Sequence, residues 1–286
     1  MCMRGARVPP HLYFVVSAVF HYLGPAFAVL LFARVAVLGV AWLRIAAAAA
    51  VFSLWRRPWR VLRDADGAAR RLLLARGAVL AVMNCCFYAA IDLLPLGTVA
   101  AIEFLPVIAL AAFGARTRRN LLALLLAVPG VYLLTGVRVE GAALGIALAF
   151  ANAGLFAVYI VLAHRVARLG VLSGIDGLAA SMLVAAVVVS PIAGWGALPA
   201  LVDPVALLAG VGVGISSSVI PYVSDQLAMC RLARSTYALM VSLLPATATV
   251  IGIVVLAQVP SAAEVAGVGL VVAGVAVHRE PREESG

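Results

Sequence analysis

Long apolar blocks separated by short polar breaks constrain the fold of this chain more than any other feature. The breaks leave ten blocks of about 20 residues, the length that crosses a hydrocarbon core as a helix. The blocks cover residues 11–32, 35–54, 72–92, 96–114, 119–136, 141–162, 173–193, 204–227, 235–257 and 262–278. Hydrophobic residues make up 65% of the chain and charged residues 12%, against about 45–50% and about 25% in a soluble domain. We therefore predict an all-α integral membrane protein with ten transmembrane helices.

The uneven distribution of basic residues over the connections predicts the orientation. All 21 are Arg, and 18 of them fall on one face, at the two termini and after the second, fourth, sixth and eighth blocks. The connection from Arg56 to Arg76 alone carries seven. The other face has Arg34 and Arg138, and Arg44 lies inside a block. Because cytoplasmic loops carry the excess of Arg, we expect a multi-pass protein of the plasma (inner) membrane with both termini in the cytoplasm.

The net charge of +9 and the remaining composition exclude several classes of function. Basic residues beside membrane spans contact anionic headgroups, so membrane lipids are expected partners and nucleic acid is not. The sequence has no G-x-x-x-x-G-K-[ST] phosphate loop, which excludes an ATP-driven pump encoded in this one chain. It also lacks an H-E-x-x-H pair and any nucleophile with its base, so an enzyme is not predicted. The four cysteines have neither metal nor disulfide spacing, and no cofactor or metal is expected; they are Cys2, Cys85, Cys86 and Cys230.

Polar side chains recur on particular helix faces, because residues four apart lie on one side of a helix. Asn84, Tyr88 and Asp92 form one such stripe, and Ser218 and Tyr222 belong to another. Asn152 and Tyr159 share a face, and a titratable histidine, His21, lies midway along the first block. Such faces either line a polar cavity or hold helices together by hydrogen bonds. The glycines of the second stripe, Gly210 and Gly214, favour close helix packing.

Charged residues within or at the ends of the blocks are the strongest functional candidates. They are Arg44, Asp92, Glu103 and Asp225, and a charge near the bilayer centre costs from about 3 to more than 10 kcal/mol. Glu103 follows Leu96 by seven residues, which places it about 10 Å into its span. Glu103 and Asp225 are therefore candidates for proton coupling, with a static ion pair between Glu103 and Arg44 as the alternative. Arg44 either attracts a substrate carboxylate or locks the fold, and Asp92 is assigned a charge-pairing role.

A weak internal repeat relates the two halves of the chain. The stretch from Tyr88 to Pro106 has an echo about 138 residues later that ends at Pro245. Five blocks precede the midpoint and five follow it, so the two copies are predicted to be inverted in the membrane. We place the repeats at residues 9–137 and 141–278. Four prolines inside blocks, Pro106, Pro129, Pro221 and Pro245, are predicted to bend their helices.

The segment N-C-C-F-Y-A-A-I-D-L-L-P-L-G-T-V-A-A-I-E-F, from Asn84 to Phe104, resembles the threonine/homoserine exporter branch of the drug/metabolite transporter superfamily, the EamA-type permeases. A second match runs from Ser217 through S-S-V-I-P-Y, and Leu43-Arg44 follows the same pattern. The resemblance implies two inverted five-helix repeats and proton-driven efflux of small amino acids. It also implies a central cavity lined by spans 1, 3, 4, 6, 8 and 9. The chain departs from the family pattern at Leu244 and Gln258, where relatives carry Glu.

From these features we predict a secondary transporter that exports small amino acids or related metabolites, coupled to protons by alternating access. The alternatives are an exporter of another solute, such as a drug or an aromatic metabolite, and a passive channel. The sequence leaves the oligomeric state open. The predicted substrate-binding residues are His21, Asn84, Tyr88, Glu103, Asn152, Tyr159, Ser218 and Tyr222.

Overall fold

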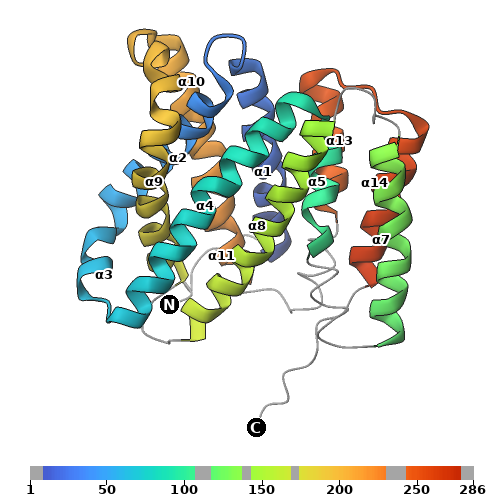
Figure 1. The fold of residues 1–286 in the computed structure, drawn as a ribbon, viewed down its shortest axis with the longest axis horizontal. Helices are drawn as coiled ribbons and strands as arrows, with labels where there is room; N and C mark the ends of the chain where they lie inside the picture. The colour runs from blue at the N-terminus through green and yellow to red at the C-terminus, as the bar shows by residue number, and fades with distance from the viewer. Residues whose placement is uncertain (1–8, 107–116, 137–142, 169–173, 230–242, 278–286) are drawn as a thin grey trace.

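The computed structural model describes residues 9–106, 117–136, 143–168, 174–229 and 243–277, and these contain helices and short connections without a β-strand. Figure 1 shows the arrangement. The helices are α1 (Pro10–Leu31), α2 (Val37–Arg56), α3 (Pro58–Asp64), α4 (Gly67–Leu93), α5 (Leu96–Glu103), α7 (Arg118–Gly136), α8 (Ala143–Arg168), α9 (Gly174–Val202), α10 (Pro204–Gly214), the π-helical turn η1 (Ile215–Val219), α11 (Ile220–Met229), α13 (Leu244–Leu256) and α14 (Ala262–Val277).

Within the described residues, six helical segments are long and apolar enough to cross a membrane: Leu12–Leu31, Val37–Arg56, Gly67–Leu93, Ala143–Arg168, Gly174–Val202 and Pro204–Asp225. Large apolar side chains such as Leu54, Val187 and Leu208 point outward and are more than half exposed. A surface of this kind is stable against lipid and not against water. The predicted class, an all-helical multi-pass membrane protein, is confirmed, whereas the count of ten spans stays a prediction.

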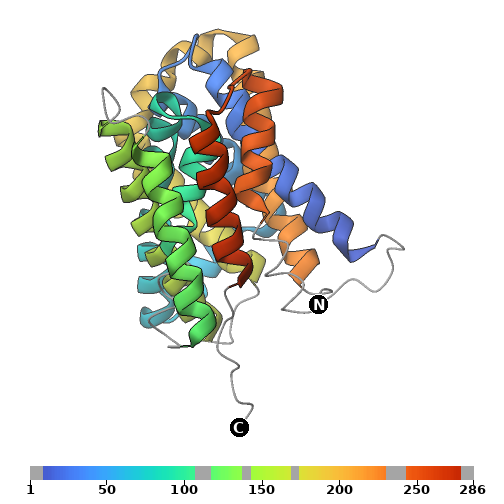
Figure 2. The same cartoon turned by 90° about the vertical axis from the view of Figure 1, so that its right-hand side faces the viewer.

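Close packing joins helices that lie far apart in the sequence. The most extensive pairs are α2 with α9, α4 with both α8 and α9, and α7 with α14, while α5 lies against α13 and α1 lies against α10, η1 and α11. Figure 1 shows α7 and α14 at the right-hand edge of the molecule, and Figure 2, viewed from that side, shows them side by side. Glycine permits the closest approaches, since a Cβ on Gly210 would lie 2.7 Å from Leu43 Cδ1 and one on Gly214 would lie 2.8 Å from the Arg44 carbonyl oxygen. The predicted packing role of these two glycines is confirmed.

The arginine-rich end of the molecule is built around α3. Arg70, near the start of α4, donates to the carbonyl oxygens of Leu62, Arg63 and Ala65 and so satisfies the C-terminus of α3. Asp66 caps α4 by accepting from the Ala69 N–H at 2.6 Å. The start of α1 and the end of α14 lie toward this same end in Figure 1 and Figure 2.

The opposite end carries a capped connection between α9 and α10. Asp203 accepts hydrogen bonds from the N–H groups of Ala206 and Val205, and it pairs with Arg34 at 3.4 Å. The backbone hydrogen bond from Ala206, followed by the one from Val205 and the Arg34 charge, lowers the pKa of Asp203 from its usual value. This capping fixes the start of α10, the helix that leads into η1.

Candidate functional site

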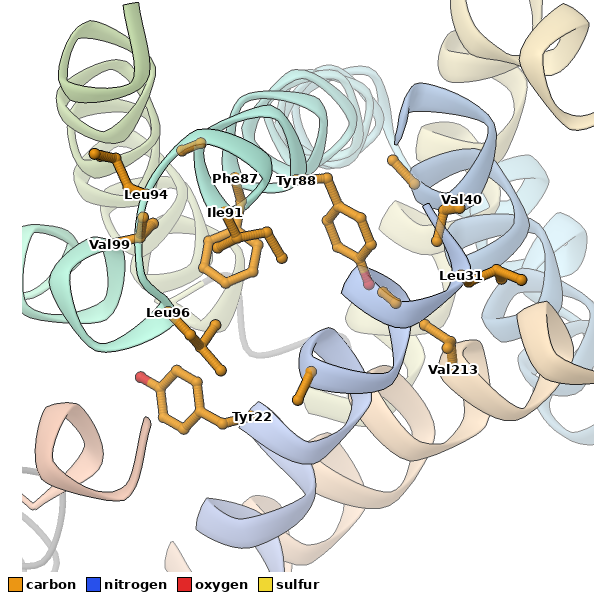
Figure 3. Packing of buried hydrophobic residues seen from close by; sticks show 14 of the residues in the cluster. Tyr22, Leu31, Val40, Phe87, Tyr88, Ile91, Leu94, Leu96, Val99 and Val213 are labelled. Atoms are coloured by element: carbon orange, nitrogen blue, oxygen red, sulfur yellow. The ribbon is translucent and has the colours of Figure 1, made fainter. Parts of the chain in front are cut away.

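The interior between α1, α2, α4 and α5 is an apolar core with polar groups at its edges. Figure 3 shows the Tyr22 ring of α1 beside Leu96 of α5, and the Tyr88 ring reaching from α4 toward α1. Both tyrosines are fully buried, and Phe87, Ile91 and Val99 are also in this cluster. The apolar surroundings raise the strength of any electrostatic interaction at the edges, because the local dielectric constant is low.

Arg44 is buried on α2 and is held against η1. Its Nε donates to Ser218 Oγ at 3.0 Å and its Nη2 donates to the carbonyl oxygen of Ser217 at 3.2 Å. Pro221 lies four residues after Ser217 and has no N–H, so the α-helical donor for that carbonyl is missing. The guanidinium carbon also lies 5.4 Å from the centre of the Tyr88 ring, a cation–π distance. A π-helical turn next to a proline therefore creates the acceptor that orients Arg44.

Glu103 is buried at the end of α5 and is hydrogen-bonded to α8. Asn152 Nδ2 donates to Glu103 Oε1 at 3.2 Å, and both side chains are buried. Glu103 lies within electrostatic range of Arg44 and of Tyr22, and His21 lies within range of Arg44. The described residues contain three salt bridges, and none of them joins Glu103 to Arg44. We refer to the following residues as the Arg44 cluster: His21, Tyr22, Arg44, Tyr88, Glu103, Asn152, Ser217 and Ser218.

Three polar atoms of the Arg44 cluster are buried without a partner. The Tyr22 hydroxyl, the Tyr88 hydroxyl and Asn152 Oδ1 make no hydrogen bond to any described residue. Buried polar groups are nearly always hydrogen-bonded, because the loss of a partner costs about 1–3 kcal/mol. Unfilled hydrogen-bonding capacity beside Glu103 is therefore consistent with a site that receives a polar ligand or water.

A second buried arginine lies further along α4, and the sequence analysis missed it. Arg76 was assigned to the connection before the third span, but it lies nine residues past Gly67, inside α4. Arg76 Nη2 donates to the Tyr159 hydroxyl at 2.8 Å, and its guanidinium carbon lies 4.8 Å from the centre of the Tyr159 ring. A signal was present, since Arg76 precedes Asn84 by eight residues and so continues the polar stripe of Asn84 and Tyr88.

The other predicted residues fall into different surroundings. Asn84 is buried and donates to the Leu80 carbonyl oxygen of its own helix at 2.8 Å. Tyr222 is half-buried on α11, within electrostatic range of Tyr159, Arg44, Glu103 and Arg76. Asp225 is half-buried on the next turn of α11.

Asp92 is exposed and lines a cavity of about 270 Å³, with Thr98, Gln258 and Glu264. In this cavity Gln258 Oε1 accepts from the Leu96 N–H at 3.2 Å, so the glutamine caps α5, the helix that carries Glu103. Glu264 is used locally, in a capping box with Ser261 at the start of α14. The cavity is therefore separate from the contacts that define the Arg44 cluster.

The predicted proline bends stay predictions, but the prolines have distinct surroundings. Pro221 is buried, and its carbonyl oxygen accepts from Ser17 Oγ of α1 at 3.1 Å. Pro245 lies in the first turn of α13, where a missing N–H costs no helical hydrogen bond. Pro106 follows Glu103 by three residues and is half-buried.

Buried cations and a buried carboxylate between apolar helices are what a multi-pass membrane transporter requires, because charged groups within a membrane mark solute and ion pathways. The EamA-like transporter family matches residues 143–278. The chain is 31% identical to the threonine/homoserine exporter RhtA of Salmonella typhimurium (strain SL1344), over 91% of this chain and 89% of that protein. It is 32% identical to RhtA of Escherichia coli (strain K12), over 87% and 84% respectively. The chain therefore belongs to the EamA-like transporter family.

A solved structure supports the fold independently. One crystal structure of another protein matches with a TM-score of 0.59 at 20% identity, over 93% of this chain and 96% of that chain. At this level of identity the match shows the shared fold alone. The RhtA relatives nonetheless agree with the resemblance seen in the segment from Asn84 to Phe104.

Proposed function

We propose that this protein exports small amino acids of the threonine or homoserine type, or closely related metabolites, from the cytoplasm by proton-coupled alternating access. The single observation that carries the proposal is the Arg44 cluster, in which a buried guanidinium and a buried carboxylate lie close together without a direct ion pair. An amino acid presents a carboxylate and an ammonium group, which are the complements of Arg44 and Glu103. The names of the RhtA relatives favour the same class of solute.

The packing of the helices supports two inverted five-helix repeats, which we propose lie at residues 9–137 and 141–278. The apolar blocks correspond in chain order to α1, α2, α4, α5 and α7, and then to α8, α9, the segment from α10 to α11, α13 and α14. In this order α1 corresponds to α8, α2 to α9, α4 to the segment from α10 to α11, α5 to α13 and α7 to α14. If the two sets are exchanged, the packed pairs α2/α9, α5/α13 and α7/α14 each become themselves. The pair of α1 with α10–α11 maps onto α4/α8. A pseudo-two-fold axis in the membrane plane produces this exchange.

We also propose that both termini lie in the cytoplasm, and the same arrangement supports this orientation. The start of α1 and the end of α14 lie toward the end that carries α3 and its arginines (Figure 1, Figure 2). An excess of arginine marks the cytoplasmic face. Export then requires that the Arg44 cluster open first toward the α3 end and then toward the end that carries Asp203.

In the proposed mechanism, Arg44 binds the solute carboxylate and Glu103 exchanges the proton. Loss of a proton from Glu103 creates an anion that holds the solute ammonium, and protonation at the outer side releases it. Asn152 fixes one oxygen of Glu103 from α8 while the other oxygen is left to face the solute. Asp225, Tyr222 and His21 are proposed as supporting groups along the same pathway.

The test is efflux of labelled threonine and homoserine from preloaded proteoliposomes under an imposed pH gradient. We expect gradient-dependent, saturable efflux by the wild type and its loss in Glu103→Gln, which keeps the size and the Asn152 hydrogen bond but not the titrating proton. Asp92→Asn is the matched control, because Asp92 is exposed outside the Arg44 cluster. Equal efflux by wild type and Glu103→Gln contradicts the role of Glu103. Efflux that does not saturate indicates a channel, and the absence of flux from folded wild type contradicts the amino-acid assignment.

A further inference from the structure

We propose that Arg76, with Tyr159 and Tyr222, forms a second anion-binding site that receives the carboxylate of the solute on its way to the Arg44 cluster. The proposal rests on the proposed function for the direction of passage, but the binding site itself is inferred from the contacts of Arg76. We refer to Arg76, Tyr159 and Tyr222 as the Arg76 site.

The first argument is the incomplete set of partners around Arg76. The guanidinium carries five N–H donors, and Tyr159 accepts from only one of its nitrogens. The side chain is 8% exposed, and its Nε has no hydrogen-bond partner in the part of the chain that the structure describes. None of the three ion pairs recorded in those residues includes Arg76. A buried guanidinium with unused donors and no carboxylate is complementary to a carboxylate ligand.

The second argument is the packing around the guanidinium. The Tyr159 ring lies against it, with the ring centre 4.8 Å from the guanidinium carbon. Gly177 of α9 is the neighbour of the Nη1 atom, since a Cβ added to this glycine would lie 3.6 Å from Nη1 and 3.3 Å from Val166 Cγ1. The cation–π contact with Tyr159 restrains the plane of the guanidinium and uses none of its N–H donors beyond the one that Tyr159 accepts.

The third argument is the relation of the two sites. Tyr159 and Asn152 lie seven residues apart on α8, which places the Arg76 site about 10 Å along the helix from Glu103. Tyr222 lies within electrostatic range of both Arg76 and Arg44. On α4, Arg76 is nearer than Tyr88 to the helix start beside α3. A solute that enters at the α3 end therefore meets Arg76 before it meets Arg44.

The chemical class of ligand follows from the groups present. The Arg76 site offers a planar cation and two phenol hydroxyls, and the charged groups within range of Tyr222 are Arg44, Arg76 and Glu103. A small carboxylate fits this set, whereas the ammonium group of an amino acid gains nothing there and is held only at Glu103. The Arg76 site should therefore bind the carboxylate of an amino acid and of a simple hydroxy acid equally well.

The test measures binding of labelled 3-hydroxybutyrate, which has a carboxylate and no amine, to the purified full chain in detergent. The measurement is made in Arg44→Gln, so that the Arg44 cluster does not contribute. We expect binding that homoserine displaces and that threoninol, an amino alcohol without a carboxylate, does not. Adding Arg76→Gln should weaken binding at least about tenfold, which corresponds to about 1.4 kcal/mol. Arg71→Gln is the matched control, because Arg71 is exposed on the same helix.

A second measurement keeps the proposal testable where Arg44→Gln does not fold. In the otherwise wild-type chain, Arg76→Gln should raise the KM for homoserine added at the α3 side at least about tenfold, with Vmax changed less, and Arg76→Lys should restore part of the loss. A lower melting temperature of Arg76→Gln with unchanged binding and KM shows a purely structural arginine and overturns the proposal. Carboxylate binding that depends on Arg76, in a protein that carries no amino-acid flux, upholds the site and overturns the proposed function instead.

Discussion

Gly24→Ala tests whether the position of η1 between α1 and α2 controls the Arg44 cluster. A Cβ on Gly24 would overlap Ser217 Cβ and lie 2.8 Å from the Ser217 Cα and N atoms. Carbon atoms in contact prefer about 3.5–4.0 Å, so α1 and η1 must separate by about 0.7 Å or more. The turn cannot yield toward α2, because Gly214 already lies against the backbone of Arg44. We therefore expect α1 to move away.

The cost can be worked from the contacts that this movement removes. Overpacking of this kind costs about 1–3 kcal/mol. The hydrogen bond from Ser17 Oγ to the Pro221 carbonyl oxygen, now 3.1 Å, becomes too long and removes about 0.5–1.5 kcal/mol more. The sum is about 1.5–4.5 kcal/mol, which lowers the melting temperature by at least about 3 °C. Because His21 and Tyr22 move with α1, efflux should also fall although no polar residue has been changed.

The assay combines thermal unfolding in detergent with flux in proteoliposomes. Gly212→Ala and Gly154→Ala are the controls, because an added Cβ at either position meets nothing within 4 Å. We expect both control variants to match the wild type. A Gly24→Ala protein that melts and transports like Gly212→Ala would refute the reasoning, since it would mean that α1 and η1 are not in close contact in the membrane.

Two further predictions concern single polar contacts. Ser218→Ala should destabilise the protein by about 1.5–3 kcal/mol in thermal unfolding, because it leaves the buried Arg44 Nε without its acceptor. Ser216→Ala should have little effect, since Ser216 bonds only to its own helix at Val213, and equal losses in the two variants would contradict the prediction. Asp203→Asn should lower the melting temperature near neutral pH, where the charge is present, because the folded state lowers the pKa of Asp203. A group with a lowered folded pKa stabilises above its unfolded value, about 3.9, and loses this effect as the pH falls through the folded pKa. The difference between the two melting temperatures should therefore begin to shrink below about pH 4 and disappear as the pH falls further, and a difference that stays constant across this range would contradict the assignment to charge.

Apolar blocks predicted the positions of the long helices well, and two of the misplaced helix ends have a physical explanation. The block at 72–92 corresponds to α4, which begins five residues earlier because Asp66 caps its start. The block at 173–193 corresponds to α9, which continues to Val202 through Pro191 and Pro199. Prolines in membrane helices are accommodated by neighbouring helices, so a break in the apolar pattern at Pro191 did not end the helix.

Members of the Arg44 cluster could be found from sequence, but their contacts could not. Glu103 and Asn152 are both polar groups in apolar blocks, which made each a candidate. Nothing in either segment indicates that α5 and α8 bring them to 3.2 Å. It was in principle predictable that the Ser217 carbonyl oxygen lacks its α-helical donor, because Pro221, four residues later, has no N–H. The sequence does not indicate which group donates to this oxygen instead, since Arg44 comes from a helix more than 170 residues earlier.

Arg76 was overlooked because charge at a helix end and charge inside a helix look alike in a sequence. Arg70, Arg71 and Arg76 follow one another closely, and the first two lie exposed at the start of α4. At 1.5 Å per residue, the five residues from Arg71 to Arg76 carry the side chain about 7.5 Å further into the bundle. The face of the helix decides the rest, since Arg76 shares the stripe of Asn84 and Tyr88 whereas Arg71 does not.

The different ways in which the two arginines are held suggest different roles. Arg44 donates two hydrogen bonds to η1, one to the Ser218 hydroxyl and one to the Ser217 carbonyl oxygen, so its guanidinium has a defined direction. Arg76 donates one hydrogen bond, to the Tyr159 hydroxyl, and keeps an unused donor. A solute bound only by Arg76 loses few contacts when it leaves, and a solute between Arg44 and Glu103 gains contacts from both of its charged ends. Binding is therefore weaker at Arg76 and stronger between Arg44 and Glu103. This difference favours movement of a zwitterion from the first site to the second, whereas a simple carboxylate gains less from that movement. Selection of amino acids over hydroxy acids should therefore arise at Glu103 and not at Arg76.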